Sequence, residues 1–139
     1  MEEGLLVSVI TASAAGDVSG AEIEAAAAGI WVNKIQVEDV SGIDYAITID
    51  AASQFDQAVS DITPLCLFGS KGAGSSTVRT GPDSAGTIVG AGALIPALGA
   101  DASNLLAAPI FVPAGKFLTV RRRTVATATH ISFQFWEKD

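Results

Sequence analysis

The stretch IDYAITID at residues 43–50 decides the expected fold. Its apolar side chains Ile43, Tyr45, Ile47 and Ile49 recur at every second position, and smaller or more polar residues lie between them. Successive side chains of an extended strand point to opposite faces, so this spacing gives the strand one apolar face. The alternation predicts a half-buried β-strand.

A second strand is predicted directly before this one. In residues 30–40, Ile35 and Val37 alternate with polar residues, and Ser41-Gly42 marks a turn. Two strands with so short a connection predict a β-hairpin.

The rest of the chain repeats this pattern of short strands and Gly- or Pro-containing turns. Further strands are predicted at residues 5–10, 62–68, 77–80, 87–89, 93–95, 110–112, 116–121 and 130–136, with turns at 81–83 and 113–115. In the last strand Ile131, Phe133 and Phe135 are expected to face inward. Short strands about ten residues apart are typical of antiparallel sandwiches rather than of βαβ units. The expected fold is therefore all-β, an antiparallel β-sandwich of jelly-roll-like type.

The first 29 residues differ from the remainder and are expected to form an extended or partly helical N-terminal segment. Residues 1–29 are assigned as a strand or arm plus an Ala-rich stretch, and residues 30–139 as the β-sandwich domain. Residues 21–28, AEIEAAAA, have the strongest helix propensity in the chain, and Gly29 follows as a suitable cap. This favours a loop or a short helix. The competing interpretation is an extended segment whose small side chains allow close packing between subunits.

Composition points to a protein that works as an assembly. The chain has 139 residues and a net charge of −7, and 49% of its residues are hydrophobic but only 17% are charged, against roughly 25% in soluble domains. Either the apolar residues are mostly small and scattered, or a large apolar face is buried against another subunit. We expect a homo-oligomer. The negative charge argues against nucleic acid as a partner, because phosphate binding needs a basic surface.

No membrane segment or secretory signal is expected. The longest uncharged run, residues 84–100, contains Pro96 and several glycines, which makes it a poor membrane helix. The chain starts with Met1-Glu2-Glu3, where a signal peptide would carry basic residues. One Cys and one His exclude a disulfide framework and a Cys/His zinc cluster within one chain.

The sequence offers no catalytic residues and no cofactor site. The Gly-rich stretch GSKGAGSS at residues 69–76 has its Lys too early for a P-loop and no helix after it. A Ser–His–Asp site would depend on His130, the only imidazole, and no nucleophile elbow is present. Asp44 and Asp50 lie too far apart along one strand to act as an acid/base pair. The chain is therefore expected not to be an enzyme.

No metal site is assigned, but the sequence leaves two hypotheses for one. Three copies of His130 could meet on a symmetry axis. Glu38 and Asp39 could approach Asp44 across the predicted hairpin and hold Ca²⁺. The ordinary alternative is a solvated acidic face.

Arg121, Arg122 and Arg123 form the one sharp charge feature of the chain. Arginine pairs carboxylates through a planar fork and is favoured at interfaces, so we weigh docking against a solvated strand end. With the apolar first strand, the candidate interface comprises Leu5, Leu6, Val7, Val9, Ile10, Arg121, Arg122 and Arg123.

The C-terminal half resembles a known group of proteins. VPAGKFLTV at residues 112–120, TVATAT at 124–129 and the closing aromatic strand resemble small β-sandwich capsid decoration (cement) proteins of tailed bacteriophages. The likeness covers about residues 30–136 and has no diagnostic motif, so it assigns no functional residue. It implies a homotrimer on the virion exterior, assembled in the host cytoplasm, that bridges major capsid protein subunits and stabilises the lattice. Residues 1–28 would then be an arm that contacts the capsid or a neighbouring subunit.

A receptor- or carbohydrate-binding β-sandwich module of a tail or fibre is the alternative. Such a module would expose aromatic side chains to its ligand. Trp31 and Trp136 are the only candidates, and both lie beside predicted core strands.

Overall fold

The computed structural model describes residues 3–12, 18–39, 45–53, 60–62, 65–68, 74–83, 93–95, 104–122 and 129–138. The regular elements in these residues are β-strands, and their pairings are antiparallel. The predicted all-β, antiparallel class is therefore confirmed. Within these ranges the chain forms no helix long and apolar enough to cross a membrane.

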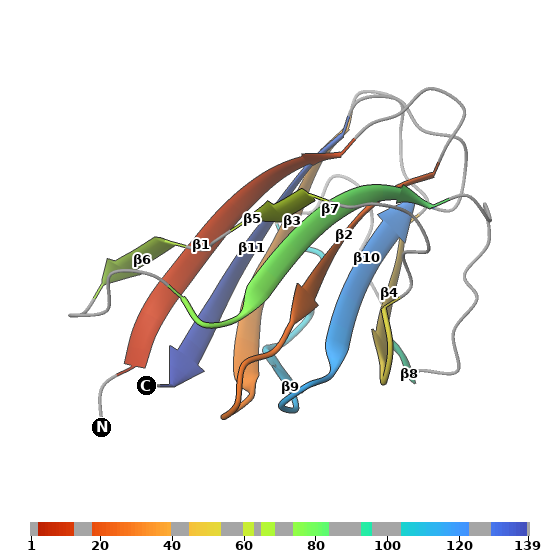
Figure 1. Ribbon diagram of the computed structural model, residues 1–139. Coiled ribbons are helices and arrows are strands. Elements are labelled where there is room, and N and C mark those ends of the chain that lie inside the picture. Colours follow the sequence, from red (N-terminus) through yellow and green to blue (C-terminus); the bar gives the residue numbers. More distant parts are fainter. Residues whose placement is uncertain are drawn as a thin grey trace.

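One sheet, here called sheet A, has five strands. Their spatial order is β6 (Leu65–Phe68), β1 (Glu3–Ala12), β11 (Thr129–Lys138), β3 (Ile30–Asp39) and β9 (Ile110–Val112). The two ends of the chain meet in this sheet, because Glu3 of β1 is the register partner of Lys138 in β11 (Figure 1). Strand β1 therefore pairs on both sides, with β6 and with β11.

Sheet B has six strands. Their order is β5 (Ser60–Ile62), β7 (Thr77–Asp83), β2 (Val18–Glu24), β10 (Phe117–Arg122), β4 (Tyr45–Asp50) and β8 (Ala93–Ile95). The register aligns Ile23, Leu118 and Ile49 across β2, β10 and β4, so these residues share one face. The first 29 residues thus supply a strand to each sheet.

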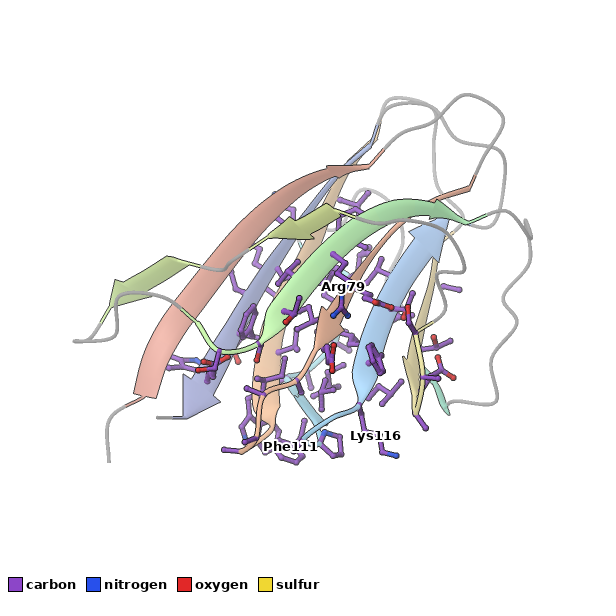
Figure 2. All side chains as sticks on the ribbon, viewed as in Figure 1. Arg79, Phe111 and Lys116 are labelled. Atoms are coloured by element: carbon purple, nitrogen blue, oxygen red, sulfur yellow. The ribbon has the colours of Figure 1, made fainter. Side chains whose placement is uncertain are left out.

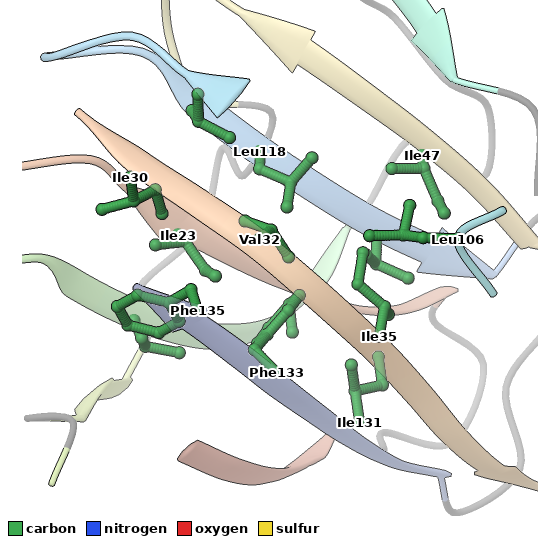
Figure 3. Packing of buried hydrophobic residues seen from close by; sticks show 14 of the residues in the cluster. Ile23, Ile30, Val32, Ile35, Ile47, Leu106, Leu118, Ile131, Phe133 and Phe135 are labelled. Atoms are coloured by element: carbon green, nitrogen blue, oxygen red, sulfur yellow. The ribbon is translucent and has the colours of Figure 1, made fainter. Parts of the chain in front are cut away.

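The hydrophobic core lies between the two sheets (Figure 3). Sheet A contributes Ile35 and the fully buried rings of Phe133 and Phe135, and sheet B contributes Leu118 and Ile47. Burying each such side chain stabilises the fold by roughly 1.5–3 kcal/mol. The inward orientation predicted for Phe133, Phe135 and Ile131 is confirmed.

The hairpin predicted from residues 30–50 is wrong. Strand β3 pairs with β11 and β9 in sheet A, whereas β4 pairs with β10 and β8 in sheet B. Both strands bury an apolar face in the same core, from opposite sides. An alternating pattern fixes which residues face inward but not which sheet a strand joins.

Local propensity also predicts the wrong structure at residues 21–28. The helical interpretation is wrong, because β2 continues to Glu24 and a turn follows at Ala27 and Ala28. The buried Ile23 between Glu22 and Glu24 has the period of a strand. Pairing with β7 and β10 on both sides outweighs the weak helix preference of isolated Ala and Glu residues.

One predicted strand and one predicted turn need correction as well. Residues 62–68 do not form one strand, since Ile62 ends β5 in sheet B and Leu65 begins β6 in sheet A. The turn predicted at residues 81–83 is the end of β7, where Pro82 pairs with Ser19. Among the described residues β5 pairs with β7 only as far as Thr80, so Pro82 lies where a missing N–H is tolerated. The strand predicted at residues 87–89 lies outside the described residues.

Candidate interaction surface

A row of aromatic residues crosses the outer face of sheet A. Trp136 of β11 is the register partner of Trp31 in β3, which in turn pairs with Phe111 of β9. Ile30 and Val32, on either side of Trp31, are fully buried in the core, so Trp31 faces outward. Trp31 is 51% exposed and Phe111 42%. Exposed large apolar side chains that are grouped together mark an interaction surface.

The Trp31 ring is held from one side by Phe111. The ring centroids are 5.3 Å apart and the planes are tilted by 49°, a geometry in which aromatic pairs attract. Phe111 in turn lies against the backbone of Gly29, where an added Cβ would come within 2.5 Å of the Phe111 Cζ atom. Figure 2 shows Phe111 at the lower end of the molecule in that view. Gly29 also has a φ of 74°, so both its backbone and its missing side chain support this stack.

On its other side Trp31 borders a groove. The groove has a volume of about 240 Å³ and is lined by Trp31, Asn33, Pro109 and Trp136. It thus combines two indole rings with one amide side chain. Aromatic walls with a few polar groups are typical of small-molecule sites.

A β-bulge places Asn33 at this groove. The register joins Gln134 to Lys34 and then Phe135 to Val32, so Asn33 is the extra residue on β3. Bulges interrupt the alternation of a strand and redirect a side chain, and they occur often beside functional sites. Asn33 lies two residues after outward-facing Trp31, and the bulge leaves both Asn33 and Lys34 between the buried residues Val32 and Ile35.

The side chain of Asn104 fixes the bulge. Its Oδ1 accepts the backbone N–H groups of Ile35 and Leu106, both at 3.0 Å, and its Nδ2 donates to the Asn33 carbonyl at 2.9 Å. The backbone N–H of Leu105 also donates to the Ile35 carbonyl at 2.8 Å. The groove wall is thus held by a satisfied amide, and its partners Ile35 and Asn33 lie about 70 residues away in the sequence.

The outer face of sheet B carries a buried ionic cluster. The fully buried carboxylate of Glu22 accepts from Arg79 Nη1 at 3.2 Å and from the Ser53 hydroxyl at 2.8 and 2.9 Å. Arg79 Nη2 donates to Glu24 at 2.8 Å. Burial opposes the charge of Arg79, but hydrogen bonds and attraction from Glu24 and Glu22 outweigh it and raise its pKa above the usual value. The cluster joins β7, β2 and the segment after β4.

A further buried carboxylate, that of Asp50, lies in the neighbouring strand β4. Asp50 is buried and accepts a hydrogen bond from the Thr48 hydroxyl at 2.8 Å. Thr119 lies between Glu22 and Thr48 in the register and is fully buried. Its Oγ1 makes no hydrogen bond within the described part of the chain.

The end of the Gly-rich loop binds a carboxylate of the chain itself. Glu137, which faces the interior, accepts the backbone N–H groups of Ser75 at 2.6 Å and Ser76 at 2.8 Å. The Ser76 hydroxyl accepts the N–H of Ala26 at 3.0 Å. The Ser75 and Ser76 amides thus bind a carboxylate of the chain itself.

The structure distributes the candidate interface residues over two sheets. Leu5, Leu6, Val7, Val9 and Ile10 lie in β1 of sheet A. Arg121 and Arg122 end β10 of sheet B, beside β2 and β4, and Arg123 lies outside the described residues.

The metal ideas gain no support from the described residues. His130 lies in β11, opposite Thr11 and Glu38. The calcium idea depended on a hairpin that does not form. Within the described ranges no group of three or more His, Cys, Asp or Glu residues could hold a metal ion.

Comparison with protein-family models, curated proteins and solved structures finds no match to this chain. Trp31 and Trp136 were predicted from the sequence as the only aromatic candidates, but Asn33 and Asn104 were not predicted. A bulge leaves no mark on a pattern of single residues, and the contact between Asn104 and Asn33 joins distant parts of the chain.

Proposed function

We propose that this chain is a non-enzymatic structural protein of a tailed-phage virion, a capsid decoration protein that docks as a homotrimer on the exterior of the lattice. The observation that carries the proposal is the outer face of sheet A along β1. Leu5, Val7 and Val9 are register partners of Trp136, Gln134 and Ser132. Trp136, Gln134 and Ser132 alternate with the buried residues of β11, so the register sets a row of three apolar residues of β1 beside outward-facing positions of β11.

The strand order supports a jelly-roll assignment for the fold. Strands β1-β11-β3-β9 stand in one sheet and β2-β10-β4-β8 in the other, and β5, β6 and β7 extend the edges. A jelly roll has eight strands in two sheets of this kind, and it is used in viral capsid and lectin domains. The fold alone does not determine function, but it agrees with a capsid role.

The composition supports assembly. With 17% charged residues and a hydrophobic content of 49%, the chain has few charges to cover its own surface. A second copy placed along β1 would lie against the register positions of Leu5, Val7 and Val9. Three linked copies would then bind a lattice with high avidity even if each contact is weak.

The direct test is to mix the purified protein with expanded capsids built from the major capsid protein of the same virion. We expect saturable co-sedimentation and a higher capsid melting temperature. Val7→Asp should lose binding, because it places a charge in the apolar row. Gln36→Asp adds the same charge at an exposed position of sheet A and should bind normally. Wild-type protein that stays in the supernatant at all ratios would overturn the proposal.

A further inference from the structure

We infer that the groove between Trp31 and Trp136 binds a saccharide ring. The inference is independent of the proposed function. The groove is lined from β3, β11 and the segment before β9, whereas the proposed subunit contact follows the β1 side of the same sheet. A protein can therefore have either property without the other.

The walls of the groove fit the chemistry of a sugar. One face of a pyranose ring presents C–H groups, which pack on the flat surface of an aromatic ring, and hydroxyl groups project from its rim. Trp31 supplies an exposed indole that Phe111 holds in place, and the partly exposed Trp136 supplies a second indole. Indole combines a large apolar surface with one N–H donor, which suits a ligand that has an apolar face and hydroxyl groups at its rim.

The polar groups of the groove fit hydroxyls better than ions. The Asn33 amide can both donate and accept, as each sugar hydroxyl does. Lys34 and Gln134 form the next outward pair beside the aromatic row, and both are partly exposed. Among the residues that the structure describes, those that line the groove include no carboxylate, so the lining offers a sugar hydroxyl more than it offers a metal cation.

The size and rigidity of the groove indicate one or two sugar units. Its volume of about 240 Å³ is below the 300–1,000 Å³ usual for drug-sized ligands. The bulge that carries Asn33 is fixed by three hydrogen bonds of Asn104 and its neighbour Leu105 to Ile35 and Asn33. A preformed site loses little conformational entropy when the ligand binds, which raises the affinity for that ligand.

Nucleic acid is disfavoured by the net charge of −7.

The test is saturation-transfer NMR on the full chain with four defined probes, namely chitohexaose, cellohexaose, maltohexaose and a galacturonic acid hexamer. We expect transfer to at least one of them at millimolar concentration. Trp31→Ala should weaken that binding by about tenfold or more, since one stacking surface is lost. Asn33→Ala should weaken it as well. Phe117→Ala, which removes an aromatic ring from sheet B, should leave it unchanged.

Three results would overturn the inference. The first is the absence of transfer to all four probes with folded wild-type protein. The second is binding that survives in Trp31→Ala, which would place the sugar elsewhere. The third is a drop in native mass for Trp31→Ala, which would make the groove a subunit contact. A monomeric wild type that still binds sugar would count against the proposed function alone.

Discussion

The Glu137 carboxylate accepts the backbone N–H of Ser76 at 2.8 Å, although 61 residues separate them in the chain. Ser76 precedes β7 of sheet B, and Glu137 lies in β11 of sheet A. The Ser76 hydroxyl also accepts the N–H of Ala26, which follows β2. This set of hydrogen bonds joins the two sheets at one end of the molecule.

Replacing Glu137 by Gln should therefore destabilise the fold. Gln keeps one acceptor oxygen but turns an NH₂ group toward a backbone donor, so a buried N–H loses its partner. We expect the free energy of unfolding to fall by roughly 2 kcal/mol, measured by urea denaturation. The matched control is Glu24→Gln, whose side chain is 37% exposed, and its change should stay below about 1 kcal/mol. Equal effects of the two variants would contradict the role assigned to Glu137.

Variants of Asn104 test how its side-chain hydrogen bonds fix the bulge at Asn33. Asn104→Ala removes all of its hydrogen bonds and should cost roughly 2–3 kcal/mol of unfolding free energy. Asn104→Asp keeps the acceptor for the N–H groups of Ile35 and Leu106 but loses the donor to Asn33, so its cost should be intermediate. Because Trp31 and Trp136 line the groove, tryptophan fluorescence reports on its structure. The emission maximum should shift in Asn104→Ala. A shift of the same size in Asn104→Asp would mean that the contact with the Asn33 carbonyl alone fixes the groove.

Thr119 and Thr48 form a matched pair on the outer face of sheet B. Thr119→Val replaces a buried hydroxyl that has no hydrogen bond within the described residues, so stability should stay equal or rise by about 1 kcal/mol. Thr48→Val breaks the hydrogen bond to buried Asp50 and should lower the free energy of unfolding by roughly 1–3 kcal/mol. Thermal unfolding of both variants gives the comparison. A loss in Thr119→Val as large as that in Thr48→Val would show that Thr119 has a partner after all.

Arg79 should be needed for the stability of the fold, because the Glu22 carboxylate that it pairs with is fully buried. Arg79→Met leaves the Glu22 carboxylate without its cation, and we expect a loss of roughly 3 kcal/mol in denaturation. The double variant Glu22→Gln/Arg79→Met removes the uncompensated charge and should recover part of that loss. Strictly additive effects would show that the two residues do not interact.

The sequence predicted the parts of the fold that local patterns encode. Ile131, Phe133 and Phe135 recur at every second position, and they form the buried face of β11. The partners of each strand could not be predicted in this way. The residues of β3 and β4 look like one hairpin, but each is paired by strands from distant parts of the chain.

The site was predictable only in part, for the same reason. Trp31 and Trp136 stand out by residue type, and alternation with buried Ile30 and Val32 puts Trp31 on the outer face. The bulge at Asn33 and the amides that bind Glu137 depend on contacts between residues about 60 to 70 positions apart. No local pattern contains that information.

The most direct test of the central claim is the native mass of the protein, measured by light scattering at two concentrations. The chain has a mass of 14.1 kDa, and we expect three times this value at both concentrations. Val7→Asp should shift the protein toward the single-chain mass, and Gln36→Asp should not. A wild-type protein that has the mass of one chain at both concentrations would contradict the account of sheet A as an assembly surface.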